Sequence, residues 1–370
     1  MTTAPAGPGF WAVMRHEDVQ YVSRTPELFS AGLGGTQLRD PDPQDLPYLR
    51  KMLLNMDPPE HNKYRRIVSG VFTRSHLAKF DQFVGTRIDE LMEPLRDGGT
   101  FDIVTEVTDD LSLSTLAYVL GVPPGDRRFF FDWANRIIGY HDDEFSDSGT
   151  VDRRSPSELT DMIEYASSLA NYRREHPGDD LISLLVNAKV EGQRLSKDQY
   201  QNFFFLLAVA GNDTTRSALP GALLALTEHP DQYALIRKDR ALIDTAVEEC
   251  LRYAPPVVHF RRTATSDTVL RGQPIRRGDK VVVFYPSANR DSAVFDRPDV
   301  FDVTRTSRAH VTFGYGPHIC VAAALARLQM RHVLARVVES FCEMGLAGPV
   351  DRLKSNFVAG IKRLPVELTV

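Results

Sequence analysis

The feature that most constrains this chain is residues 313–320, which read FGYGPHIC. Cys320 follows two glycines and precedes an Ala-rich segment, residues 321–327, with the composition of a helix. Glycines let the backbone turn tightly around the sulfur so that amide N–H groups can point at it, and the start of a helix adds partial positive charge. Both effects favour a thiolate, which is an axial ligand for iron. The alternative, a buried structural cysteine, leaves the full pattern F-x-x-G-x-H-x-C-x-x-x-x-L-A-R unexplained.

Composition limits the class of protein. The 370 residues are 42% hydrophobic and 25% charged, the balance of a soluble globular protein with a large core. The net charge of -5 gives no support for nucleic-acid binding. Three cysteines, an odd number without a disulfide framework, fit a reducing compartment. No signal peptide and no apolar run of about 18 residues is present, so we expect a cytoplasmic protein that does not enter a membrane.

The spacing of apolar residues predicts a mainly α protein with small β-sheets near its two ends. It is mostly helical from about residue 60 to residue 241, and Ser196 with Gln199 forms a capping-box signature that opens a long apolar helix. Extended segments are predicted at residues 10–13, 268–273, 280–285 and 362–370.

The chain shows no internal repeat and no low-complexity linker. Residues 1–9 are rich in Pro, Gly and Thr, and we expect them to be disordered. We expect residues 10–370 to form one domain.

Residues 210–215, AGNDTT, interrupt the apolar character of the long helix. Gly, Asn, Asp and Thr are unfavourable inside helices, and Thr can donate to the carbonyl four residues earlier. Apolar residues on both sides indicate that the segment is buried, where Asp213 beside Thr214 is costly without a function. The alternative is a kinked helix with a solvated polar face. Pro220 predicts a further weak point.

Two other charged patterns are weak by themselves. Glu249 and Arg252 share one helix face at i, i+3, but such pairs are common on solvated helices and contribute only about 0.2–0.5 kcal/mol. His61 and Arg65, at i, i+4 after a Pro-defined helix start, could form a two-pronged site for a carboxylate. They could equally be the basic face of an ordinary amphipathic helix.

Together, and in this order, these motifs resemble the cytochrome P450 superfamily of haem-thiolate monooxygenases, over nearly the whole chain. The resemblance implies the cytochrome P450 fold, haem b as cofactor and Cys320 as the axial ligand of its iron. Phe313 would pack under the macrocycle. The haem propionates would be held by His61, Arg65, Arg262 and His318.

The resemblance also implies roles for the remaining motifs. Thr214 would hydrogen-bond to oxygen bound at the iron, and Asp213 would help to relay protons from water. A buried charged clamp with a structural role would consist of Glu249, Arg252 and Arg305, the last from an F-x-x-x-R segment. Cys250, between two members of the clamp, would be plain core.

The chain departs from the family pattern in two places. Ala322 stands where the family usually has Gly, and its methyl group would press toward the macrocycle, which we expect to be tolerated. The usual first strand and helix before Phe10 are missing, so we expect the fold without them. Arg262 matches the family spacing, so Arg261 is not expected at the propionates. His259 is expected to line the pocket or face solvent rather than bind metal.

Several segments resemble the bacterial sterol and methyl-branched lipid hydroxylases, namely residues 10–13, 55–61, 210–216 and 357–362. This branch implies insertion of one oxygen atom of O2 into a C–H bond of an apolar substrate: a sterol side chain, a methyl-branched lipid or a terpenoid. The pocket would be bordered by Leu53, Leu54, Val257, Val258, Phe260 and Phe357.

No flavin or nicotinamide motif is visible, so we expect electrons to come from ferredoxin and ferredoxin reductase. We also expect a monomer. Three alternatives stay open: a tailoring oxidase of a polyketide or peptide, a peroxygenase that uses hydrogen peroxide, and a non-catalytic haem-binding or sensor protein. The intact Asp213–Thr214 pair argues against the last two.

Overall fold

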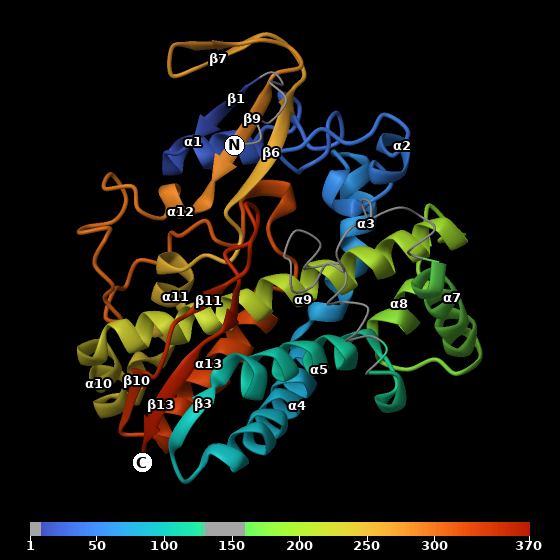
Figure 1. Cartoon of the computed structure of the whole chain (residues 1–370). Coiled ribbons are helices and arrows are strands. Elements are labelled where there is room, and N and C mark those ends of the chain that lie inside the picture. The colour runs from blue at the N-terminus through green and yellow to red at the C-terminus, as the bar shows by residue number, and fades with distance from the viewer. Residues whose placement is uncertain (1–8, 128, 130–159) are drawn as a thin grey trace.

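The protein is described by a computed structural model for residues 9–127, 129 and 160–370, apart from the side chains of Thr160, Asn212 and Asp213. Of residues 1–9, which we expected to be disordered, residues 1–8 lie outside this description. The described part is mainly helical with small sheets, which confirms the predicted fold class (Figure 1). No helix in it is both long and apolar enough to cross a membrane.

The helices have the following bounds: α1 His16–Arg24, α2 Leu46–Leu49, α3 Glu60–Ser69, α4 Arg74–Met92, α5 Asp109–Leu120, α7 Thr160–Glu175, α8 Leu181–Asn187, α9 Lys197–Glu228, α10 Pro230–Lys238, α11 Ile243–Tyr253, α12 Tyr285–Ala288 and α13 Ala323–Ser340. The strands are β1 Phe10–Val13, β2 Phe29–Ser30, β3 Gly99–Asp102, β4 Lys189–Val190, β5 Gln193–Arg194, β6 His259–Ala264, β7 Thr268–Leu270, β8 Gln273–Ile275, β9 Lys280–Phe284, β10 Glu343–Leu346, β11 Asp351–Arg352, β12 Ile361–Arg363 and β13 Pro365–Thr369.

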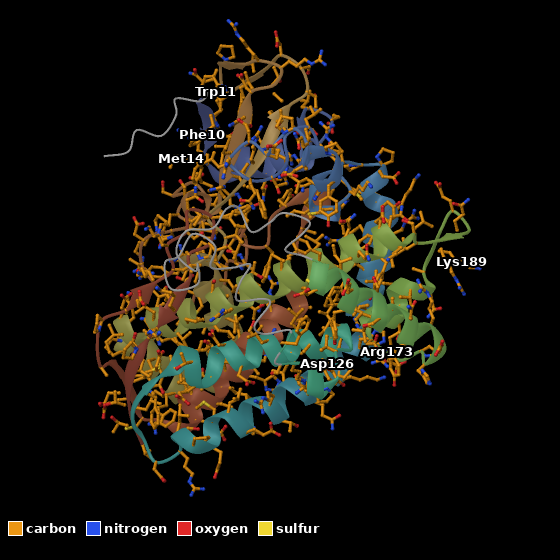
Figure 2. All side chains as sticks on the ribbon, turned by 45° about the vertical axis from the view of Figure 1, so that its right-hand side comes forward. Phe10, Trp11, Met14, Asp126, Arg173 and Lys189 are labelled. Carbon is orange, nitrogen blue, oxygen red and sulfur yellow. The ribbon has the colours of Figure 1, made fainter. Side chains whose placement is uncertain are left out.

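The sheets join segments that are far apart in the sequence. One has the order β1-β9-β6-β2, with β1 parallel to β9 and the other pairs antiparallel. A second, β10-β13-β3, brings the C-terminal strands to β3, and the remaining pairs are β11-β12, β4-β5 and β7-β8. β1 is an edge strand, and Phe10 and Trp11 within it and Met14 just after it are exposed at the rim of the molecule (Figure 2).

The predicted long helix is α9, which crosses the centre of the molecule (Figure 1). The predicted capping box is confirmed: Ser196 Oγ accepts from the Gln199 amide at 3.2 Å, and Gln199 Oε1 accepts from the Ser196 amide at 2.9 Å. The helix continues through Pro220, so this proline does not end it.

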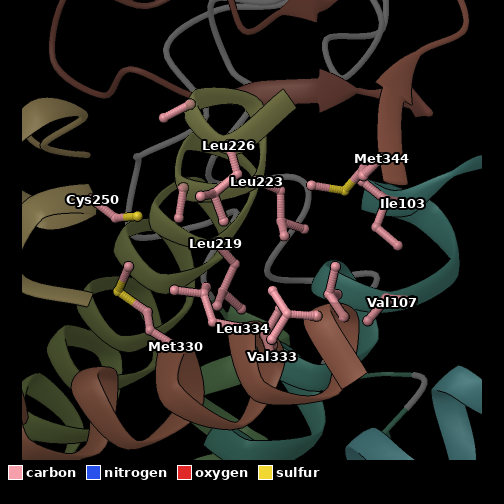
Figure 3. Packing of buried hydrophobic residues seen from close by; sticks show 14 of the residues in the cluster. Ile103, Val107, Leu219, Leu223, Leu226, Cys250, Met330, Val333, Leu334 and Met344 are labelled. Atoms are coloured by element: carbon pink, nitrogen blue, oxygen red, sulfur yellow. The ribbon is translucent and has the colours of Figure 1, made fainter. Parts of the chain in front are cut away.

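The core around the C-terminal half of α9 is made of apolar residues from several helices. Figure 3 shows Leu219, Leu223 and Leu226 of α9 facing Met330, Val333 and Leu334 of α13. Each fully buried aliphatic side chain contributes about 1.5–3 kcal/mol. A second cluster joins α5, α7 and α8 to the N-terminal half of α9, and a third lies against the β1-β9-β6-β2 sheet. All three clusters contribute residues to the wall of one large cavity.

Candidate functional site

The candidate site is a cavity between α3, α5, α9, α13, β6 and the loop before α13. It contains about 1620 Å³ of atom-free space, its open mouth included. Its wall is mostly apolar, with a few polar groups. Of the eight residues predicted from the sequence to act in catalysis or cofactor binding, seven line it: His61, Arg65, Thr214, Arg262, Phe313, His318 and Cys320.

The loop that carries Cys320 is shaped by two glycines. Gly314 and Gly316 have φ values of +75° and +69°, in the left-handed region that favours glycine. A Cβ at Gly316 would lie 2.6 Å from the Ser23 carbonyl oxygen, so α1 also requires a glycine there. The Cys320 amide donates to the Phe313 carbonyl at 2.8 Å, which closes the loop.

The thiol of Cys320 faces the cavity. Burial within the protein raises its pKa, while a hydrogen bond from the Ala322 amide and the charges of Arg65 and Arg327 lower it. The amide hydrogen bond therefore favours the thiolate, as predicted, but burial outweighs it and the net shift of the Cys320 pKa is upward. A bound metal ion would remove the thiol proton outright.

Four basic side chains meet in the cavity wall. The rings of His61 and His318 lie with their centroids 4.3 Å apart, and within the described residues His318 Nε2 has no hydrogen-bond partner. Burial lowers the pKa of His318 to about 2, and the charges of Arg262, His61 and Arg65 add to this shift. Burial likewise lowers the pKa of His61 and of Arg65.

Arg262 is 4% exposed and donates to the Arg261 carbonyl at 2.8 Å. Burial lowers its pKa. Asp57 acts on it electrostatically, but that carboxylate already accepts from the Ser30 hydroxyl and from the Ala31 amide at 2.8 Å. A low-polarity wall with four basic groups is suited to anions, and carboxylates such as propionates match their donors.

Side-chain alternation along β6 separates Arg262 from its neighbours. Arg261 is not in the cavity wall, which agrees with the expectation that it does not hold a propionate, and it pairs with Asp40 at 2.6 Å. His259, two residues earlier, shares that face and is 2% exposed, with its ring centroid 5.7 Å from the rings of Phe284 and Phe357. The prediction that His259 lines the pocket or faces solvent is therefore wrong.

Thr214 lies in the cavity wall on α9 and is only half-buried, although we expected a buried segment. Its hydroxyl donates to the Ala210 carbonyl at 2.9 Å, the predicted bond to the fourth residue before it. The side chain of Asp213 lies outside the described part of the structure, so its role stays a prediction.

Glu249, Arg252 and Arg305 lie outside the cavity wall and form a closed group. Glu249 accepts from Arg252 twice at 2.7 Å and from Arg305 Nε at 3.1 Å. Arg252 Nη1 also donates to the Asn289 and Pro298 carbonyls, at 3.0 Å and 2.6 Å. This geometry fits the predicted clamp between α11 and the loops that follow β9. Cys250 is buried in the core, as expected.

The structure also shows a residue that sequence reasoning missed. Asn289 is fully buried; its Oδ1 accepts from the Val311 amide and its Nδ2 donates to Thr312 Oγ1, both at 2.8 Å. It therefore holds the start of the Cys320 loop. Asn289 follows α12 and lies more than 20 residues before Val311 and Thr312, so the local sequence gives no signal of these contacts.

Four of the six apolar residues predicted to border the pocket line it: Leu53, Leu54, Val257 and Phe260. The prediction is wrong for Val258 and Phe357, which are not in the wall; the Phe357 ring packs 5.3 Å from that of Phe260.

Ala322 lines the cavity with φ -96° and ψ 14°, which any residue adopts without strain. Its backbone therefore does not require glycine, in line with the expected tolerance.

Comparisons with known proteins agree with this geometry. The family model described as Cytochrome P450 matches residues 127–347. The steroid C26-monooxygenase of Rhodococcus jostii is 36% identical over 363 residues, covering 97% of this chain and 75% of the relative. The linalool 8-monooxygenase of Pseudomonas putida is 36% identical over 373 residues, covering 98% of this chain and 90% of the relative. The structure of Mycobacterium marinum cytochrome P450 CYP268A2 in complex with pseudoionone is similar, with a TM-score of 0.89, 38% identity and coverage of 100% and 89%.

Proposed function

The chain belongs to the cytochrome P450 family, whose members are haem-dependent monooxygenases, and we propose that it inserts one oxygen atom of O2 into a C–H bond of an apolar substrate. The observation that carries the proposal is that Cys320, Thr214 and four basic side chains line one cavity with a mostly apolar wall.

The donors in the wall fit haem. Cys320 would hold the iron, and His61, Arg65, Arg262 and His318 would hold the propionates, whose negative charges would offset the unpaired basic groups. Bound haem would supply the iron chemistry that activates O2.

The chain's own residues would orient the substrate and deliver protons. The apolar wall, which includes Leu53, Val257 and Phe260, would exclude water and bind hydrocarbon by buried area, about 25 cal/mol per Å². The Thr214 hydroxyl, which donates to Ala210, could turn to donate to dioxygen in the cavity. Asp213 would relay protons from water toward Thr214 Oγ1.

We further propose a sterol side chain, a methyl-branched lipid or a terpenoid as the substrate. Relatives named for steroid and linalool oxidation, and a similar structure that holds pseudoionone, support this class. Electrons would come from a ferredoxin and its reductase.

Substrate class can be tested by optical titration of the haem-loaded protein, in which a ligand that displaces water from the iron shifts the spin state. We expect shifts with sterols, branched fatty acids and terpenoids. If only polar, charged metabolites shift the spectrum, the lipid proposal is wrong and a tailoring oxidase is favoured.

The reaction itself can be tested with a surrogate ferredoxin pair. Thr214→Ala should lower product formed per O2 consumed by about 10-fold or more, because a positioned proton donor contributes roughly 10²–10⁴-fold, and Thr214→Ser should retain most of it. Cys320→Ala should abolish the thiolate-type band of the reduced carbon monoxide complex. Peroxide-driven turnover that survives Thr214→Ala would favour a peroxygenase, and absence of product with every substrate would favour a sensor.

A further inference from the structure

A second charged group, separate from the Glu249 clamp, lies behind the Cys320 loop. It consists of Glu248 on α11, Arg327 on α13 and His310. Glu248 is 4% exposed and accepts from Arg327 Nε at 2.6 Å and from Arg327 Nη2 at 2.9 Å. Its Oε2 lies 3.0 Å from His310 Nε2.

The hydrogen bonds show how the Glu248 carboxylate is paired. The Thr312 amide donates to His310 Nδ1 at 3.4 Å, so the Nε2–H of His310 is free to donate to Glu248. The carboxylate of Glu248 is balanced by the guanidinium of Arg327. Burial raises the pKa of Glu248, but the hydrogen bonds from His310 and Arg327, together with the charges of these two side chains, outweigh it and lower this pKa to about 2.

Arg327 connects this group to the candidate iron ligand. Its guanidinium lies over the Phe313 ring, 4.5 Å from the centroid, and the Phe313 carbonyl accepts from the Cys320 amide. The charge of Arg327 also acts on the Cys320 sulfur, as does that of Arg65 in the cavity wall. The propionates would offset Arg65, whereas Glu248 is the carboxylate that offsets Arg327.

We propose that Glu248 is a positioning residue for the haem thiolate, which neutralises Arg327 behind the Cys320 loop and so keeps the reduction potential of the iron low. An uncompensated cation near the sulfur would stabilise the state with one more electron and weaken electron donation by the thiolate. This inference rests on the proposed function, in which Cys320 binds the haem iron.

The test is a spectroelectrochemical titration of the haem-loaded protein without substrate. Glu248→Gln keeps the shape of the side chain and leaves Arg327 charged. It should favour the ferrous form by about tenfold, which is a positive shift of the reduction potential by 59 mV for one electron. Arg327→Gln should shift the potential the opposite way, because the Glu248 carboxylate then stands alone. The double variant, which has neither the carboxylate nor the guanidinium, should return close to the wild-type potential.

Asp244→Asn is the matched control. It removes one carboxylate from the same helix, α11, whose partner Arg331 is also on α13 at 2.8 Å, but both side chains are more than half exposed. Solvent screens such a pair, so we expect no measurable shift. If Glu248→Gln shifts no more than Asp244→Asn, or if the double variant shifts as far as Glu248→Gln, charge neutralisation is wrong.

The outcomes also separate this inference from the proposed function. If the wild-type protein shows no thiolate-type band with carbon monoxide, the proposed function fails. If the wild type shows the band and the Glu248→Gln potential is unchanged, only the inference fails. If the Glu248→Gln variant does not bind haem, the Arg327→Gln variant provides the test. A reduction potential of Arg327→Gln equal to or more positive than that of the wild type would overturn the proposal.

Discussion

Two buried groups of charged side chains differ in whether their charges are paired. In the Glu249 clamp the carboxylate meets both arginines, and Arg252 also donates to backbone carbonyls. In the cavity, four basic side chains meet one another: His61, Arg65, Arg262 and His318. Within the described residues, neither arginine forms an ion pair with a carboxylate. In the Glu249 clamp, the ion pairs offset the free-energy cost of removing the charges from water. In the cavity, only an added anion can offset that cost. Pairing thus distinguishes a structural group from a binding site.

The largest expected effect comes from breaking the paired group. Glu249→Gln leaves Arg252 and Arg305 buried without their carboxylate, and should lower the free energy of unfolding by about 3–5 kcal/mol. Urea unfolding of the haem-free protein measures this. Asp244→Asn, which breaks an exposed ion pair on the same helix, should lower it by at most about 1 kcal/mol. Equal losses in the two variants would show that pairing in the clamp contributes no more than a surface ion pair.

Changing the unpaired group should have opposite effects with and without haem. Arg262→Gln removes a buried charge that no carboxylate balances and should stabilise the haem-free protein by about 1 kcal/mol, because burying a charge without a partner of opposite charge is unfavourable. It should also weaken haem binding by roughly 10–100-fold, the loss of a charged hydrogen bond. Urea unfolding and haem transfer to an acceptor apoprotein measure the two effects.

Arg261→Gln is the control, because Arg261 on the same strand pairs with Asp40 on the opposite face. It should leave haem affinity unchanged. If Arg262→Gln destabilises the haem-free protein instead, Arg262 is a structural residue and the comparison fails.

A smaller change in stability is expected from protonation of a histidine in the unpaired group. Burial lowers the pKa of His61 below its ordinary value of 6.5, so below pH 6.5 the unfolded chain binds a proton that the folded protein does not. The contribution of His61 to stability is therefore present above pH 6.5 and is lost as the pH falls, by up to about 1.4 kcal/mol per pH unit. Urea unfolding of the haem-free protein at pH 7.5 and 5.5 should show a smaller difference in His61→Gln, and an unchanged difference would contradict this.

The smallest effect is expected at Ala322, in the cavity wall beside Cys320. Because its φ of -96° needs no glycine, Ala322→Gly should change the free energy of unfolding by less than about 0.5 kcal/mol. Its haem spectrum should match that of the wild type. A clear shift in the Soret band would show that the methyl group moves the macrocycle.

Errors in the sequence analysis occurred where contacts depend on distant segments. His259 was placed in the pocket or in solvent, yet strand alternation puts it beside Arg261 and against Phe284 and Phe357. The pKa of Cys320 depends on how deeply the loop is buried, which no motif reveals. The role of Asn289 could not be predicted from the sequence, because its hydrogen-bond partners Val311 and Thr312 lie more than 20 residues away.

The sequence by itself determined the features that rest on short-range chemistry. These are the glycine turn around Cys320, the capping box at Ser196, the Thr214 bond to Ala210 and the mainly helical fold with small sheets. Only the tertiary structure decided which charges are paired. His61 and His318 are more than 250 residues apart in sequence, and the fold brings their rings within 4.3 Å in a wall of low polarity. The electrostatic energy between charged groups depends on their distance and burial rather than on their spacing in the sequence. It can therefore be judged only from the folded structure.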